Sequence, residues 1–157
     1  MLIVEGNEIY STENYSGAAE KYRAAAEVDP ANGEAHSRLG TALRQLGLYK
    51  EALESSKRAV PLTPDGPERA IIFDNMGVCE SNLGHPVTAV LYSGIALKFQ
   101  PKNARIRVHR GISYEKAGQY DRAHTDALMA LKFRPGYPPA LRLKLRLELS
   151  GHVTPLG

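Results

Sequence analysis

Apolar residues recur along the chain at helical spacing, in short blocks separated by turns. Leu39, Leu43 and Leu46 lie four and three positions apart, and a second apolar block follows a break at Gly47. This spacing is typical of an amphipathic helix, because residues three and four apart share one helix face. A glycine just after the last apolar position is typical of a left-handed helix terminator. The pattern therefore predicts two helices joined by a tight turn within residues 33–66.

The same pattern returns four times. Two sets of alanines lie between a set of glycines and a set of prolines, and within each set the steps are 34, 37 and 34 residues. A shared period in this range is typical of stacked repeat proteins. Each proline ends a unit, because proline disfavours helix in the residue before it and has no amide hydrogen to donate. The sets are Gly6, Gly40, Gly77 and Gly111; Ala18, Ala52, Ala89 and Ala123; Ala25, Ala59, Ala96 and Ala130; Pro30, Pro64, Pro101 and Pro135.

The repeated glycines stand inside a predicted helix, where glycine is unfavourable. Each costs about 1 kcal/mol relative to alanine, so the same penalty at four equivalent places indicates a compensating contact. If this glycine faces an alanine of the second helix, the two backbones can approach where a larger side chain would overpack. The sequence thus predicts four close helix–helix contacts.

The combination of these positions resembles the tetratricopeptide repeat. That family's signature has a Leu-Gly pair, a Tyr, an Ala, an aromatic residue, a second Ala and a Pro at these offsets, and the resemblance spans nearly the whole chain. The second unit carries Leu39, Gly40, Tyr49, Ala52, Ala59 and Pro64, and the fourth carries Gly111, Tyr114, Tyr120, Ala123, Ala130 and Pro135. The departures are Pro86 at the start of a second helix, and Ser56, Ser93 and Ala127 where Tyr22 provides a bulky residue.

The resemblance implies an all-α fold. We expect a right-handed α-solenoid of about four helix-turn-helix units in a single domain, 1–151, with repeats at about 1–32, 33–66, 70–103 and 104–137. A capping helix at 138–150 and a tail at 152–157 complete this organisation. The stretch PDGPERA holds three extra residues between the second and third units. Because Asp65 or Gly66 can cap a helix and Pro67 suits its first turn, the next helix is expected to start one turn early.

Residues 141–149, LRLKLRLEL, alternate strictly between apolar and charged residues. Alternation alone favours a strand. However, the segment follows Pro138 and Pro139 at the register where a further first helix would begin, and Leu, Arg and Lys are good helix formers. We therefore predict a helix here.

That helix would carry two apolar stripes, since each residue turns by about 100°. Leu141, Leu145 and Leu149 form one stripe, which we expect to cover the last hairpin. Leu143 and Leu147 would then face outward, either folded against the chain end or available as a self-association surface.

Composition is that of an ordinary globular protein, with 157 residues, 43% hydrophobic and 24% charged. Glu5 and Glu8 interrupt the apolar start, so we predict no signal peptide and no membrane insertion, and expect a cytoplasmic location. The net charge of +3 is uneven: residues 1–97 hold 8 Lys and Arg against 13 Asp and Glu, and residues 98–157 hold 12 against 4. The asymmetry could reflect nothing more than charged residues on solvated faces. Alternatively, the basic C-terminal end could bind an anionic partner or the acidic end of a second copy.

Sequence motifs for catalysis, cofactors or metals are absent. There is no GxxxxGK[ST] phosphate loop, no HExxH, and no calcium-loop or paired-cysteine zinc pattern. Cys79, the single cysteine, is interpreted as a small buried residue, and the five histidines are scattered. No basic run alternates with aromatic residues, as nucleic-acid binding would favour. We expect no enzyme activity, no cofactor, no metal and no nucleic-acid partner.

Function is then expected on the surface. In the tetratricopeptide family the first helices line a concave groove, which implies groove positions here by offset. Side-chain amides there would hold a peptide backbone and arginines would fork onto carboxylates, so we expect an extended, acidic peptide or chain terminus. The implied positions are Arg38, Thr41, Arg44, Asn75, Val78, Asn82, Arg105, His109, Ile112, Lys116, Arg142 and Arg146.

Three hypotheses follow. The leading one is a non-enzymatic adaptor that binds this acidic segment in the groove. The second is a self-assembling scaffold, in which the acidic end of one copy meets the basic, leucine-striped C-terminal helix of another. The third is a clamp for chaperone C-terminal carboxylates, as in one subfamily, whose residue types Asn75 and Arg105 match but Ser37, Thr41 and His109 do not.

Overall fold

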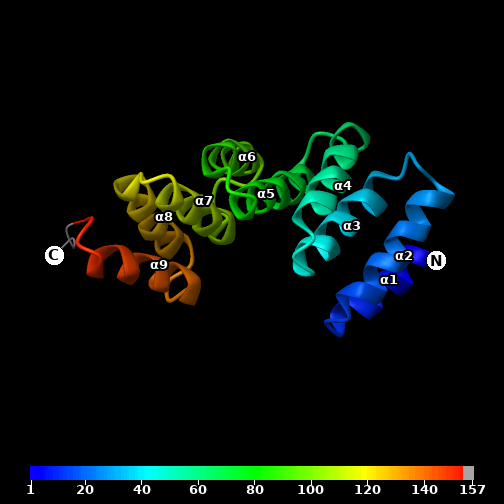
Figure 1. The fold of residues 1–157 in the computed structure, drawn as a ribbon, viewed down its shortest axis with the longest axis horizontal. Helices are drawn as coiled ribbons and strands as arrows, with labels where there is room; N and C mark the ends of the chain where they lie inside the picture. Colours follow the sequence, from blue (N-terminus) through cyan, green and yellow to red (C-terminus); the bar gives the residue numbers. More distant parts are fainter. Residues whose placement is uncertain (154–157) are drawn as a thin grey trace.

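The computed structural model describes residues 1–153, which form nine helices and no strand. The helices stack side by side along the long axis of the molecule, with α1 and α9 at opposite ends (Figure 1). The predicted all-α solenoid is confirmed. In chain order the helices are α1 (Leu2–Ser11), α2 (Tyr15–Val28), α3 (Gly33–Gln45), α4 (Tyr49–Leu62), α5 (Pro67–Asn82), α6 (Pro86–Phe99), α7 (Ala104–Lys116), α8 (Tyr120–Phe133) and α9 (Pro138–Leu149).

Packing in this stack is local. Within the hairpins α1 packs on α2, α3 on α4, α5 on α6 and α7 on α8, and each second helix also packs on the first helix that follows it. The first helices α3, α5, α7 and α9 touch one another in sequence as well. They therefore form a continuous wall along one side of the solenoid.

Local sequence signals set the helix ends. Asn14, Asn32 and Asn103 each precede a helix and accept a hydrogen bond from its third amide through the side-chain oxygen, which satisfies a donor that the helix itself leaves free. Every second helix ends two residues before the proline of its repeat. The expected left-handed terminators are confirmed by positive φ angles of 75°, 88° and 72° at Gly47, Gly84 and Gly118.

The repeated glycines lie where helices touch. A Cβ added to Gly40 would stand 2.6 Å from Ser56 Oγ and 3.1 Å from the carbonyl oxygen of Ala52 on α4. At Gly77 the corresponding distances, to Ser93 Oγ and to the carbonyl oxygen of Ala89, are 2.7 and 3.1 Å. A side chain cannot fit at such distances in a close-packed interior. The predicted glycine–alanine contact is confirmed in these two hairpins.

In the first and last hairpins the repeat glycine is also closely packed, but against different residues. A Cβ on Gly6 would meet the ring of Tyr22 at 2.6 Å. On Gly111 it would meet Leu143 Cδ2 of α9 at 2.7 Å and the carbonyl oxygen of Ala123 at 3.3 Å. The bulky residue opposite the glycine therefore comes from α2 in the first unit and from α9 in the last.

Helix α5 begins early, as predicted. It starts ten residues before Gly77, whereas α3 and α7 start seven residues before their glycines. Gly66 is the residue before the helix and Pro67 is its first residue. The three added residues make nearly one turn, which extends α5 beyond its neighbours along the wall of first helices.

Helix α9 forms as predicted, but its two leucine stripes face opposite to the prediction. Leu143 and Leu147 are each 1% exposed, whereas Leu141, Leu145 and Leu149 are 46%, 56% and 78% exposed. The expected assignment is therefore wrong, and Leu143 and Leu147 are not available for self-association. The reason is that Leu143 fills the space left by Gly111.

Glu148 of α9 accepts one hydrogen bond from α8, which ties the two helices together, and one from within α9. Lys144 Nζ and His124 Nε2 each donate a hydrogen bond of 2.8 Å to the carboxylate of Glu148. These bonds hold the pKa of Glu148 below its ordinary value. Beyond the helix, His152 stacks on Tyr120, and residues 154–157 of the expected tail lie outside the described part of the chain.

Candidate functional site

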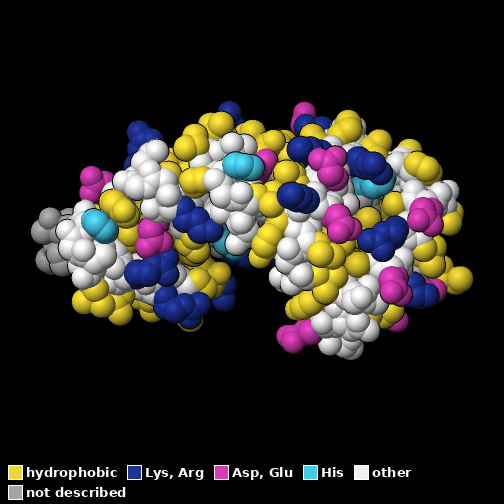
Figure 2. All heavy atoms as spheres, viewed as in Figure 1, with side chains coloured by type: hydrophobic (Ala, Val, Ile, Leu, Met, Phe, Trp, Pro, Cys, Tyr) yellow, Lys and Arg dark blue, Asp and Glu magenta, His cyan; other side chains and the backbone are white. Residues whose placement is uncertain are grey.

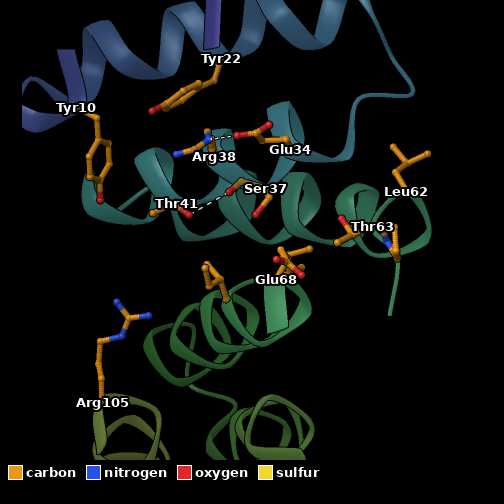
Figure 3. A pocket seen from close by; sticks show the side chains of 13 residues that line it. Tyr10, Tyr22, Glu34, Ser37, Arg38, Thr41, Leu62, Thr63, Glu68 and Arg105 are labelled. Atoms are coloured by element: carbon orange, nitrogen blue, oxygen red, sulfur yellow. Dashed lines mark hydrogen bonds and ion pairs between the residues drawn. The ribbon is translucent and has the colours of Figure 1, made fainter. Parts of the chain in front are cut away.

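A groove of about 610 Å³ opens along the first helices, at the N-terminal part of the stack. Figure 3 shows Tyr10 and Tyr22 pointing into it from α1 and α2, and Arg105 reaching toward it from α7. The side chains that line it come from α1, α2, α3, the end of α4, the α4–α5 connection, α5 and α7. They are Tyr10, Tyr22, Glu34, Ser37, Arg38, Thr41, Leu62, Thr63, Pro64, Glu68, Ile71, Ile72 and Arg105.

Apolar side chains are exposed inside this groove. Ile71 on α5 is 43% exposed, and Leu62 at the end of α4 is 37% exposed. Ile72 next to Ile71 is fully buried and so anchors the helix that presents it. Exposed aliphatic groups in a hollow can be covered only by another molecule or segment, which makes the groove a candidate binding surface.

Charged side chains border the apolar part. Arg38 donates from Nε to Glu34 at 2.7 Å, one turn earlier on α3, and both side chains are largely exposed. Arg105 Nη2 lies 3.5 Å from Asp74, and the Arg105 side chain is 49% exposed. On the face in Figure 2 the surface is hollowed between the α1–α3 end and the α7–α9 end, and most visible Asp and Glu side chains lie over the former.

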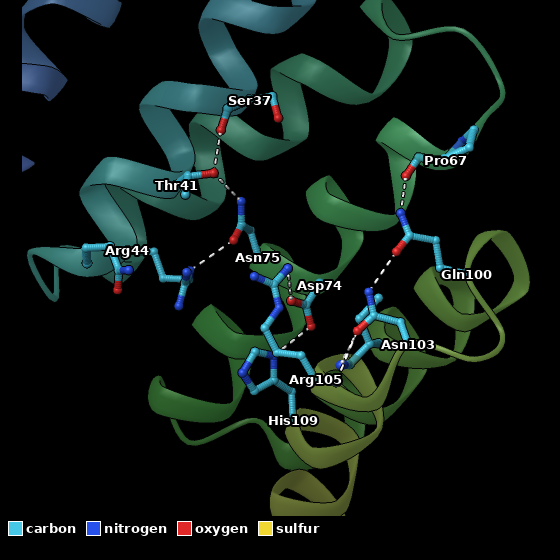
Figure 4. Close-up of polar contacts among 12 residues, drawn as sticks. Ser37, Thr41, Arg44, Pro67, Asp74, Asn75, Gln100, Asn103, Arg105 and His109 are labelled. Atoms are coloured by element: carbon cyan, nitrogen blue, oxygen red, sulfur yellow. Dashed lines mark hydrogen bonds and ion pairs between the residues drawn. The ribbon is translucent and has the colours of Figure 1, made fainter. Parts of the chain in front are cut away.

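Buried Asp74 organises the wall between α5 and α7 (Figure 4). His109 Nδ1 donates to its carboxylate at 2.8 Å, and Arg105 approaches the second oxygen. A carboxylate removed from water requires such partners. Asp74 thus holds Arg105 at the groove while leaving part of its guanidinium exposed.

Asn75 links α3 to α5 instead of facing a ligand. Its Nδ2 donates to Thr41 Oγ1 at 2.7 Å and its Oδ1 accepts from Arg44 Nε at 2.9 Å. The Asn75 side chain is buried. Its amide is therefore engaged inside the wall, and the expected role of Asn75 and Arg44 in holding a peptide backbone finds no support in these contacts.

Of the twelve sequence-predicted groove residues, only Arg38, Thr41 and Arg105 line the groove. Several others are engaged elsewhere: Lys116 Nζ donates to the Ser81 carbonyl, Asn82 to the Val78 carbonyl, and Arg146 to Glu115. Ile112 packs against the α7–α9 core. Arg142 is exposed and, within residues 1–153, forms no ion pair.

Sequence reasoning missed much of the groove. It did not place Tyr10, Tyr22, Leu62, Glu68 or Ile71 there. For Ile71 a signal existed, because Glu34, Ile71 and Arg105 each stand six residues before a repeat glycine. The tyrosines and Leu62 belong to α1, α2 and α4, and their approach to α3 and α5 depends on how the hairpins stack.

The described residues offer little else that could support chemistry. Burial raises the pKa of the Cys79 thiol to about 11, which makes it a poor nucleophile. No three His, Cys, Asp or Glu side chains gather as a metal site within residues 1–153. In the same part of the chain, no helix has the length and apolar character to cross a membrane.

The fold and the groove define a class: stacked helical hairpins whose first helices line a groove. The family model "Tetratricopeptide repeat" matches residues 4–67, and the same residue sets continue to Pro135. Residues 4–67 thus match the tetratricopeptide repeat, and the later hairpins share its spacing and fold.

Known proteins share this fold. The crystal structure of MamA has a TM-score of 0.79 at 21% identity over 94% of this chain and 84% of that one. The crystal structure of YrrB, described as a TPR protein with an unusual peptide-binding site, has a TM-score of 0.74 at 20% identity over 96% and 76%. In sequence, FK506-binding protein-like of Rattus norvegicus is 28% identical over 129 residues, 79% of this chain. The chain spans only 37% of that relative's length.

Proposed function

We propose that this protein is a non-enzymatic adaptor that binds an extended segment of a partner protein in the groove. The observation that carries the proposal is the presence of exposed aliphatic side chains, Ile71 and Leu62, between partly exposed arginines on α3 and α7. The peptide-binding site named for YrrB, a protein of the same fold, supports it. We further propose that residues 1–151 act as one domain in the cytoplasm.

The partner segment is proposed to carry acidic residues toward the C-terminal repeats. Arg105 and Arg142 keep exposed charge there, and residues 98–157 are strongly basic. Each exposed ion pair contributes about 0–1 kcal/mol, so binding should be about micromolar and should weaken with salt. The engagement of Asn75 by Thr41 and Arg44 argues against a chaperone-tail clamp.

Charge reversal tests this proposal. Arg105→Glu combined with Arg142→Glu should abolish capture of partners from the native cell extract, because both substitutions repel a carboxylate. Capture would be measured by quantitative mass spectrometry of proteins retained on the immobilised chain. Lys132→Glu, an exposed cation outside the groove, is the matched control. Unchanged partners with unchanged helicity would contradict the proposal.

Self-association through α9 is the second candidate function, now through the exposed leucines in place of Leu143 and Leu147. Leu141, Leu145 and Leu149 form an exposed apolar stripe, beside a basic end that could meet the acidic end of another copy. Leu141→Glu with Leu145→Glu should convert any oligomer to monomer in light scattering across protein and salt concentrations. A wild-type protein that stays monomeric at high concentration would exclude this candidate.

A further inference from the structure

The groove wall changes chemical character in a regular order along the stack. Glu34, Ile71 and Arg105 occupy the same register on α3, α5 and α7, each six residues before a repeat glycine. All three line the groove. An acid, an aliphatic residue and a base therefore follow one another across three neighbouring helices.

The early start of α5 strengthens the acidic side. Its added first turn carries Glu68, which lines the groove together with Glu34. In Figure 3, Glu34 and Glu68 lie on the side of Leu62 and Thr63, and Arg105 reaches in from the opposite side. The groove thus has two acids at one end and an arginine at the other.

These charges remain available to a ligand. Glu34 pairs with Arg38 within one exposed helix turn, a type of pair that contributes little and exchanges readily. Arg105 shares Asp74 with His109 and keeps about half of its side chain exposed. Glu68 is exposed, and Ile71 between the two ends is exposed although aliphatic.

We propose that the groove selects a bipolar segment of a partner protein, with a basic, an aliphatic and an acidic residue opposite Glu34, Ile71 and Arg105. Packed helices lie about 8–10 Å apart. A chain in the polyproline II conformation advances about 3.1 Å per residue and presents every third residue on the same side, so the three ligand residues stand at every third position. The order can run in either chain direction. This inference rests on the proposed groove binding, but replaces a uniformly acidic partner with one that is acidic only at the α7 end.

Four fluorescein-labelled peptides in a Ser background test this order. The first carries Lys, Leu and Glu at every third position, and the others replace Lys by Glu, Glu by Lys, or Leu by Ser. Fluorescence anisotropy at low salt should show the bipolar peptide binding most tightly. Each wrong charge should weaken binding about three- to fivefold, and loss of Leu about tenfold.

Wall variants should change these preferences in opposite directions. Arg105→Glu should make the peptide with two Lys the best ligand, and Glu34→Lys with Glu68→Lys should favour the peptide with two Glu. Glu20→Lys and Lys132→Glu, exposed positions outside the groove lining, are the matched controls and should change nothing. Circular dichroism confirms that each variant is folded.

The inference is overturned if the bipolar peptide fails to bind, if the peptide with two Glu binds as tightly, or if the wall variants leave the order unchanged. The last two outcomes concern the ligand's charge order alone. The adaptor function fails separately, when the Arg105 and Arg142 reversal leaves capture from extract intact.

Discussion

Gly40 and Gly77 show how a missing side chain can hold a fold together. Each lets its helix approach the partner helix so closely that an added Cβ would clash with a buried serine hydroxyl and crowd a backbone carbonyl. The residue opposite is a serine in both hairpins, and within the described chain the hydroxyls of Ser56 and Ser93 are buried without a hydrogen-bond partner. An unpaired buried hydroxyl is unfavourable, so close backbone packing must contribute more than the hydroxyls cost.

A pair of glycine substitutions distinguishes the stability contributed by the close helix contact from the effect of helix propensity. Gly77→Val should lower the free energy of unfolding by about 2–3 kcal/mol, because the new side chain overpacks against α6. Gly94→Val should change it by less than about 0.5 kcal/mol, since no atom lies within 4 Å of a Cβ there. Urea unfolding followed by circular dichroism measures both. Equal losses at the two positions would contradict the account.

Cys79 offers a test of burial in the third hairpin. Its pKa is raised from 9.0 to about 11 by burial, so the native thiol should resist an aromatic disulfide reagent at pH 8 and react fully in denaturant. Because the folded-state pKa is the higher one, this group's contribution to stability is complete below about pH 8.5 and is lost as pH rises toward 11. Rapid labelling of the native protein would show that Cys79 is accessible.

Helix α9 marks the limit of what the repeat pattern could predict. The hairpins, their glycine contacts, the early start of α5 and the helical state of residues 141–149 followed from spacing, capping and proline chemistry. The inward face of α9 did not, because two opposite leucine stripes are equally apolar. The repeat spacing nevertheless contained this information. Leu145 stands 34 residues after Gly111 and therefore occupies the position of a repeat glycine. In complete hairpins that position faces the second helix.

Two alanine substitutions in α9 check the corrected face. Leu143→Ala should cost about 2–4 kcal/mol of stability, because it empties the space beside Gly111. Leu145→Ala should cost less than about 0.5 kcal/mol, since its side chain is half-exposed. Thermal and urea unfolding report the difference, and the reverse order would restore the original prediction.

The groove was predicted in position more than in composition. First helices could be aligned by period, and Arg38 and Arg105, placed on the wall in this way, do line the groove; their role in binding stays a prediction. A polar side chain on the wall, however, can be satisfied by a ligand or by a neighbouring helix, and the sequence does not distinguish the two. Asn75 is the instructive case, because its partners Thr41 and Arg44 belong to the preceding repeat.

The molecule as a whole is held by contacts between neighbours in the stack. Helices α1 to α4 share no substantial contact with α7 to α9, so stability should be a sum of hairpin and interface contributions that can be lost piece by piece. The acidic N-terminal helices and the basic C-terminal helices are therefore distant in sequence and also free to unfold separately.

Hydrogen exchange should reveal this independence. In Leu143→Ala, amides of α7, α8 and α9 should exchange faster, because the loosened end opens without the rest. Amides of α1 to α4 should keep their wild-type rates. Mass spectrometry of peptic fragments measures both regions, and a uniform acceleration along the chain would show that the stack unfolds only as a unit.

The wall residues and the repeat glycines lie six positions apart on each first helix, which places them about 120° apart around the helix axis. Helix packing and groove recognition therefore depend on different residues of the same helix. Substitutions at positions 34, 71 and 105 could change the partner protein without disturbing the packing of the hairpins. Among related proteins, the groove positions should therefore vary with the partner, whereas the repeat glycines should stay the same.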